Sequence, residues 1–105
     1  GRTAGLTSLI FLNSDKLGTQ YRNDMFVGDV HNGRIYHFKL NADRTDLVLP
    51  NSLESKLLTS LYATGVDKII FGQGFGGITD LTVGPDGYLY VVSIGQGKIF
   101  RILPK

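Results

Sequence analysis

Asp29 and His31 are the two side chains whose types and spacing best suit an acid/base or metal-binding pair. They lie two residues apart, just after the apolar run Met25-Phe26-Val27. A carboxylate beside an imidazole can exchange protons with a substrate or help to hold a metal ion. The alternative is structural, with Asp29 bonding the backbone of a turn and His31 facing solvent. We favour the structural alternative.

A set of polar residues is expected on the same face of the molecule as this pair. Successive strands of a meander run in opposite directions, so alternate connections lie at the same end of the sheet. The connections 29–33, 72–77 and 93–97 should therefore meet. We assign no catalytic residue and no metal ligand there. The candidates for cofactor binding on this face are Asp29, His31, Asn32, Gln73, Thr79, Asp80, Ser93 and Gln96.

The segment Gly72-Gln73-Gly74-Phe75-Gly76-Gly77 has the G-x-G-x-x-G spacing of a nucleotide-binding fingerprint. That fingerprint needs a helix directly after it, because the helix N-terminus meets the pyrophosphate. Here the next residues, Ile78-Thr79-Asp80-Leu81, have the pattern of a strand. We therefore interpret the glycines as a tight crossing between two structural units.

Two further polar positions have structural explanations. His37 alternates with Lys39 on the predicted polar face of a strand, so a solvent-exposed role is expected. Asp80 follows Thr79 as Ser8 follows Thr7. A short polar side chain that recurs in this way is expected to bond nearby backbone. The sequence has no serine-hydrolase elbow, zinc-protease motif or phosphate loop.

Seven short strands are expected to position these residues. Hairpin turns are predicted at Asn32-Gly33, Pro85-Asp86-Gly87 and Gln96-Gly97. Residues 41–44 should form a polar loop, and 51–64 the one long connection, with a helix-like stretch at 53–62. The predicted strands cover residues 6–12, 24–30, 34–40, 68–71, 78–83, 88–93 and 98–103.

The chain repeats itself along its length. Met25-Phe26-Val27 aligns with Leu89-Tyr90-Val91, and residues 33–36 align with 97–100, both shifted by 64 positions (89 minus 25). Residues 5–9 align with 77–81, shifted by 72 (77 minus 5), because the first hairpin is longer. Four-stranded repeats of about 40–50 residues are typical of β-propeller blades. The alternative is an ordinary meander or sandwich with accidental similarity.

The predicted fold class is therefore all-β, as a single partial propeller domain over residues 1–105. It has two antiparallel four-stranded propeller blades, the first over about 5–72 and the second over about 77–103. The second blade lacks its last strand. Several strands are apolar on consecutive residues, which is typical of sheets buried on both faces, as stacked blades are.

The composition excludes several classes of function. The 105 residues include 11 Lys and Arg against 9 Asp and Glu. The resulting net charge of +2 is too small to favour nucleic acid or an anionic membrane as a partner. The absence of cysteine rules out disulfides and thiolate sites. No stretch is apolar enough to span a bilayer, and the N-terminus has no signal-peptide pattern.

Four segments also carry a resemblance to a known family. They are residues 5–9 (GLTSL), 23–29 (NDMFVGD), 71–81 (FGQGFGGITDL) and 84–91 (GPDGYLYV). Together they resemble the C-terminal blades of glucose/sorbosone dehydrogenase-like propellers, the soluble quinoprotein sugar dehydrogenase superfamily. The resemblance implies a six-bladed propeller. Its active members bind pyrroloquinoline quinone (PQQ) and calcium, oxidise sugars, and lie outside the cytoplasm.

The resemblance maps the cofactor-binding positions of that family onto this chain. In active members this region supplies a lysine before a hairpin glycine and two arginines in an Arg-x-Arg-Asp segment. The lysine position falls on His31 and the arginine positions on Gly77 and Thr79, while the aspartate is retained as Asp80. A cofactor with three carboxylates needs cations nearby, so we expect no cofactor in this chain alone. The catalytic histidine of the family comes from an earlier blade with no counterpart here.

Three hypotheses for function follow. The first, which we favour, is a propeller fragment or two-blade module with a binding face and without catalytic activity of its own. The second is a PQQ-dependent sugar dehydrogenase, active only with further blades or as an oligomer. The third is a purely structural repeat module that assembles with copies of itself. Two blades leave wide faces and strand edges uncovered, so we expect a longer propeller chain or a homotrimer that closes a six-bladed ring.

Overall fold

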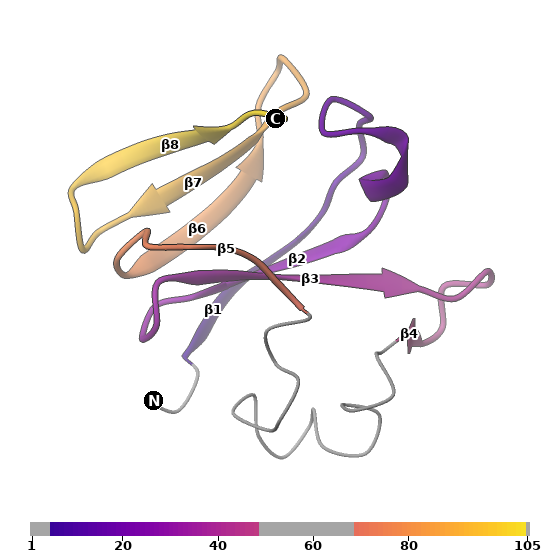
Figure 1. The fold of residues 1–105 in the computed structure, drawn as a ribbon, viewed down its shortest axis with the longest axis horizontal. Helices are drawn as coiled ribbons and strands as arrows, with labels where there is room; N and C mark the ends of the chain where they lie inside the picture. Colours follow the sequence, from indigo (N-terminus) through magenta and orange to yellow (C-terminus); the bar gives the residue numbers. More distant parts are fainter. Residues whose placement is uncertain (1–4, 49–68, 105) are drawn as a thin grey trace.

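The computed structural model describes residues 5–48 and 69–104. Within them the chain forms eight β-strands in two antiparallel sheets, together with one short 3-10 helix, η1 (Thr19–Tyr21). In Figure 1 the first four strands of the first sheet run from indigo to magenta and its last strand is dark orange, while the second sheet runs from orange to yellow. The prediction of an all-β fold is confirmed.

The first sheet contains the strands of the first repeat. β1 (Leu6–Phe11), β2 (Met25–Asp29) and β3 (Arg34–Leu40) pair antiparallel in sequence order. β5 (Ile70–Gln73) then pairs with the beginning of β3, as the fourth strand of the predicted unit should. A fifth strand that was not predicted, β4 (Leu47–Val48), pairs with Lys39 and Leu40 at the far end of β3.

The prediction of four strands in this sheet is therefore wrong by one. β5 ends its pairing at Tyr36, so the last residues of β3 are left for another partner. The turn at residues 41–46 supplies one, because Asn41 accepts hydrogen bonds from the backbone of Thr45 (2.9 Å) and Asp46 (3.2 Å) on its side-chain oxygen. The chain consequently folds back along β3. The predicted helix-like stretch at 53–62 lies outside the described residues.

The second sheet consists of β6 (Ile78–Val83), β7 (Leu89–Ser93) and β8 (Lys98–Ile102), again antiparallel and in sequence order. The sequence repeat corresponds to a structural one. Leu9, Val27 and Tyr36 lie side by side across the first sheet, as Leu81, Val91 and Phe100 do across the second. The register shift in β1 between Leu6 and Ser8 recurs in β6 between Ile78 and Asp80.

The predicted hairpins form, with glycine at the position that needs a positive φ. Gly33 and Gly97 take φ of 64° and 63° at the end of the two equivalent loops, and Gly87 takes 84° in the turn after β6. A residue with a Cβ is strained in this region, whereas glycine is not. The loop at Asn32-Gly33 is four residues long, because Asp29 pairs with Arg34.

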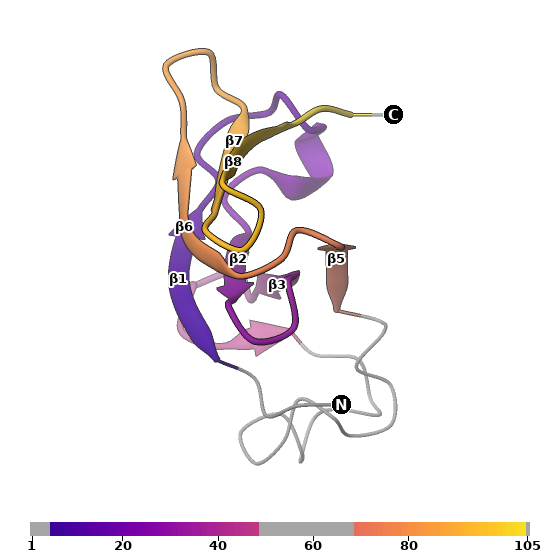
Figure 2. The ribbon, with the colours of Figure 1, turned by 90° about the vertical axis from the view of Figure 1, so that its left-hand side faces the viewer.

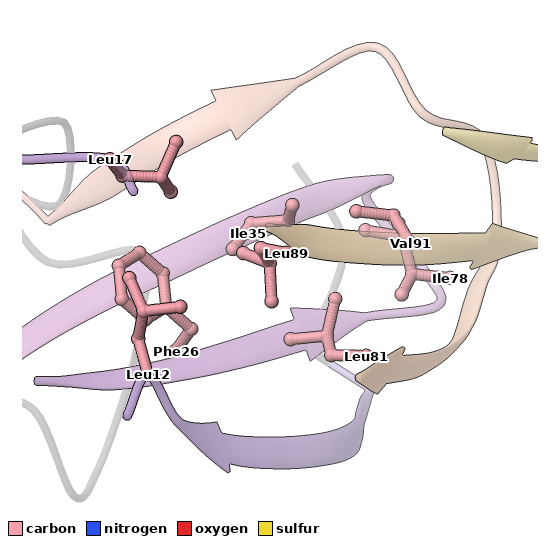
Figure 3. Packing of buried hydrophobic residues seen from close by; sticks show 8 residues of the cluster. All are labelled: Leu12, Leu17, Phe26, Ile35, Ile78, Leu81, Leu89 and Val91. Atoms are coloured by element: carbon pink, nitrogen blue, oxygen red, sulfur yellow. The ribbon is translucent and has the colours of Figure 1, made fainter. Parts of the chain in front are cut away.

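The two sheets pack face to face through a shared apolar core. Figure 3 shows its eight buried side chains, four from the first repeat and four from the second. They are Leu12, Leu17, Phe26, Ile35, Ile78, Leu81, Leu89 and Val91. We call the face of each sheet that points into this core its inner face, and the opposite one its outer face.

The sheets are closest at their first strands. Figure 2 shows β1 and β6 together at one edge of the molecule and β5 at the other. The hydroxyl of Thr7 in β1 donates to the carbonyl of Ile78 in β6 at 2.6 Å. A Cβ on Gly28, in the neighbouring strand, would lie 2.7 Å from the Ile78 side chain, so glycine permits this approach.

Candidate functional site

The three connections predicted to share a face do meet. Phe75 N–H donates to the carbonyl of Gly33 (3.2 Å), and Ile94 N–H donates to the carbonyl of Gly77 (2.9 Å). A Cβ on Gly33 would lie 2.8 Å from the backbone of Gly76, and one on Gly95 only 2.5 Å from the nitrogen of Gly77. The glycines of residues 72–77 therefore form a close backbone crossing between the sheets, as predicted.

Asp29 is the centre of this face, and it is fully buried. One carboxylate oxygen accepts from the backbone N–H groups of Gly5 (3.0 Å), His31 (2.9 Å) and Asn32 (3.2 Å). The other accepts from the Asn32 side-chain amide (2.8 Å) and from the Tyr36 hydroxyl (2.8 Å). A buried charge is tolerated only when it is paired in this way.

These contacts shift the pKa values of Asp29 and Tyr36. Burial raises the pKa of Asp29, but hydrogen bonds from Asn32, Gly5 and Tyr36 outweigh it, so the pKa is lowered from its usual 3.8. Burial and the bond to Asp29 raise the pKa of Tyr36 from 10.0 to about 12, although the nearby Arg34 acts in the opposite direction. Asp29 is thus an ionised acceptor at neutral pH, as the structural interpretation requires.

The described contact between Asp29 and His31 runs through the backbone N–H of His31. The imidazole packs over Gly5, where a Cβ would lie 2.9 Å from three ring atoms. Asp29 links the start of the described chain to this hairpin through the same Gly5. The arrangement is that of a turn aspartate.

Ser93 takes the place of Asp29 in the second sheet and is also buried. Its hydroxyl donates to the carbonyl of Phe75 and accepts from the backbone N–H of Gln96 (3.2 Å). The Gln96 side-chain amide donates to the carbonyl of Gly74 (2.8 Å). Both candidates therefore fasten the hairpin after β7 to the glycine crossing.

Gln73, Thr79 and Asp80 are exposed. In the repeated pairs Thr7-Ser8 and Thr79-Asp80, the side chain that contacts a backbone carbonyl is the threonine. Ser8 makes no such contact within the described part of the chain. Thr7 donates to the carbonyl of Ile78, and the Thr79 hydroxyl lies 3.5 Å from the carbonyl of Val92. The Ser8 hydroxyl is buried and has no hydrogen-bond partner among the described residues.

His37 is the residue whose prediction is wrong. It was expected to face solvent, but its side chain is only 19% exposed, and Nε2 lies 2.7 Å from Oδ2 of the buried Asp24. The same oxygen accepts from Lys39 Nζ at 3.0 Å. The strand face that carries His37 is the inner face, and there the rings of Tyr21, from the first hairpin, and Phe71, from β5, cover it. Alternation along β3 gives no signal of this.

A cavity of about 730 Å³ lies beside His37, where the two sheets diverge. The 3-10 helix, β5 and the end of β8 form its walls. Tyr21 contributes an aromatic wall, its ring edge-on to those of His37 (5.0 Å between centroids) and Phe71 (5.4 Å). This is a concave site lined by both aromatic or aliphatic side chains and polar groups, among them Gln20, Tyr21 and His37.

The residues of the predicted face do not fit PQQ and calcium. His31, Gly77 and Thr79 supply no lysine or arginine for the carboxylates of the quinone. Both oxygens of Asp29 are occupied by donors of the protein itself. Among the described residues no three His, Asp or Glu side chains come together as metal ligands.

Neither a family model, nor a curated protein, nor a solved structure matches this chain. Within the described residues, no helix has the length and apolar character needed to cross a membrane.

Proposed function

We propose that this chain is an assembly module without catalytic activity of its own, two propeller blades that stack head to tail with other copies of the chain. A second copy of the chain covers the outer face of each sheet. The observation that carries the proposal is that two faces carry equivalent residues. One is the inner face of the second sheet, which is buried inside the chain, and the other is the outer face of the first sheet, which is partly exposed.

The buried face is the inner face of the second sheet, which carries Leu81, Val91 and Phe100 at positions that lie side by side. Their equivalents in the first repeat are Leu9, Val27 and Tyr36, which lie on the outer face of the first sheet. The next row of that face is Phe11, Met25 and Phe38. The outer face of the first sheet thus has the pattern of a face that receives another sheet.

This outer face is covered unevenly. Val27, Tyr36 and Phe38 are buried in a second cluster with Ile69. Along β1, however, Leu9 is 56% exposed and Phe11 44% exposed. Apolar side chains gathered at one edge of a sheet favour an interface.

The complementary surface is the outer face of the second sheet. There Tyr90, Val92 and Ile99 occupy the positions that Phe26, Gly28 and Ile35 hold on the inner face of the first sheet. Ile99 is 70% exposed. Stacking this face on the outer face of the first sheet of the next copy repeats the contact that already exists within one chain. Such head-to-tail contacts close into rings.

Solution mass tests the proposal. The chain has a mass of 11.5 kDa, so three copies that supply six blades should give about 34.5 kDa by light scattering or native mass spectrometry. Leu9→Lys should prevent assembly without unfolding the chain, because the side chain is already 56% exposed. Val48→Lys is the matched control, since Val48 is 55% exposed but lies on β4, opposite Lys39.

Mixing two variants tests the direction of stacking. Leu9→Lys and Ile99→Lys should each be monomeric alone. Mixed in equal amounts they should form a dimer of about twice 11.5 kDa, because each retains the face that the other has lost. A wild-type chain that stays monomeric up to high concentration, or a mixture that stays monomeric, would contradict the proposal.

A further inference from the structure

The cavity beside His37 leads to a second role that does not depend on assembly. It lies where the sheets diverge, between β5 and the end of β8, and its described lining includes no Asp, Glu, Lys or Arg. Its volume of about 730 Å³ lies in the range of small-molecule sites, about 300–1,000 Å³. A site without charged lining residues favours a neutral ligand, because a charged one would lose its hydration without compensation.

The rings around the cavity favour a flat ligand. Tyr21, His37 and Phe71 form one wall, and Phe75 lies on another part of the lining. Phe75 is held in place by an edge-on contact with Phe100 at 5.3 Å. Aromatic rings attract a further ring in offset or edge-to-face arrangements.

The polar anchor of the cavity is the imidazole of His37. The Asp24 carboxylate can only accept, so in the neutral imidazole Nε2 carries the hydrogen that it donates at 2.7 Å. Nδ1 is then the acceptor of the ring, since the hydrogen bonds of His37 among the described residues run through its backbone N–H and Nε2. Asp24 and its second partner Lys39 hold this tautomer in place.

We propose that the cavity binds a small neutral molecule with a flat aromatic ring and a hydrogen-bond donor, the donor on Nδ1 of His37. Phenols, indoles and similar heteroaromatic N–H compounds have this chemistry. The ring lies among Tyr21, Phe71 and Phe75, and the donor selects among ligands of similar shape. The side chains that position His37 are Asp24 and Lys39.

Indole and 1-methylindole are suitable probes, since they share a shape and only indole has an N–H. Titration into the 15N-labelled chain should move the amide signals of Phe71, Gly72 and Phe75 in a saturable way. Indole should bind about 2- to 10-fold more tightly, the effect of one hydrogen bond of about 0.5–1.5 kcal/mol. The absence of saturable shifts, or equal affinity for the two probes, would overturn the proposal.

Two variants separate binding from folding. His37→Phe keeps a ring of similar size but has no acceptor, so it should bind both probes equally. Leu103→Trp should fill the cavity from just after the end of β8, leave the Asp24–His37 pair unchanged in sequence, and abolish binding of both. Ile94→Trp is its control, because Ile94 is also an exposed apolar residue but does not line the cavity. Wild-type affinity in Leu103→Trp would place the probes elsewhere and exclude this site.

Discussion

The two sheets have the same strand pattern, but they hold their equivalent hairpins by different chemistry. In the first sheet a buried carboxylate, Asp29, gathers five donors. In the second sheet a neutral hydroxyl, Ser93, makes one donated and one accepted hydrogen bond. A repeated backbone can therefore keep its geometry while the polar group at its centre changes from a charge to a neutral group.

The neighbouring aromatic residues of Asp29 and Ser93 differ as well, since only Asp29 has one with a hydroxyl. Tyr36 donates its hydroxyl to Asp29, while the equivalent residue beside Ser93 is Phe100, which has no hydroxyl. A buried carboxylate needs every available donor, whereas a serine hydroxyl can be satisfied by backbone alone. The comparison indicates that Asp29 and Tyr36 are a coupled pair, and that replacing one calls for replacing the other.

Removing the carboxylate should have the largest effect. We expect Asp29→Ala to lower the free energy of unfolding by about 3–5 kcal/mol, because several donors lose their acceptor at once and each costs about 1–3 kcal/mol when buried and unpaired. Ser93→Ala should cost about 1 kcal/mol. Urea unfolding followed by circular dichroism measures both. Similar losses for the two variants would remove the distinction between the hairpins.

Asp29→Asn is the companion variant if Asp29→Ala does not fold. It keeps the shape and one acceptor oxygen, so its loss should be intermediate. In the wild type, the pKa of Asp29 is lowered in the folded state. Its contribution to stability is therefore complete above the unfolded pKa of 3.8 and is lost as the pH falls through the lower folded value. Asp29→Asn should lack this part of the acid dependence.

Much of this fold could be predicted from the sequence. Apolar runs such as Met25-Phe26-Val27 located the strands to within about two residues, and glycines at hairpin ends located the turns. The repeat predicted which residues of the two sheets are equivalent. These features are local, or depend on the comparison of two segments.

What could not be predicted depends on tertiary contacts. His37 and Lys39 alternate with apolar residues as a solvent face would, but Tyr21 and Phe71 fold over His37, and the end of β8 closes the other side of its cavity. β4 has two residues and no pattern of its own. Asp29 was recognised as a turn residue, but its burial depends on Gly5 and Tyr36, which lie in other strands or segments.

Removing the hydroxyl of Tyr36 should have a smaller effect on stability than removing the carboxylate of Asp29. Tyr36→Phe gives the first sheet the aromatic residue of the second, and should cost about 1.5–3 kcal/mol at neutral pH because the lost hydrogen bond has a charged acceptor. In the folded state the pKa of Tyr36 is raised from 10.0 to about 12. The stability it provides is therefore complete below pH 10 and is lost as the pH rises towards 12.

Unfolding in urea at a series of pH values from 8 to 12 measures this effect as the difference between Tyr36→Phe and the wild type. The difference should shrink as the pH rises. Tyr90→Phe is the control in the second sheet, since the Tyr90 hydroxyl also donates to a carboxylate, that of Asp86 (2.6 Å), but both residues are only half-buried. A gap between wild type and Tyr36→Phe that stays constant across this pH range would show that the pair is not coupled.

The smallest effect should come from the one buried hydroxyl that the first sheet leaves without a partner among the described residues. The Ser8 side chain lies opposite Gly28, close to the position where a Cβ would be. The equivalent of Ser8 in the second sheet is the exposed Asp80.

Because burying an unbonded hydroxyl is unfavourable, Ser8→Ala should raise the free energy of unfolding by up to about 1 kcal/mol. Asp80→Ala, at the same place on a surface open to water, should change it by less than about 0.5 kcal/mol. A loss of stability in Ser8→Ala, measured by the same urea unfolding, would mean that this hydroxyl is satisfied in solution, and that the first sheet is as fully hydrogen-bonded at its first strand as at Asp29.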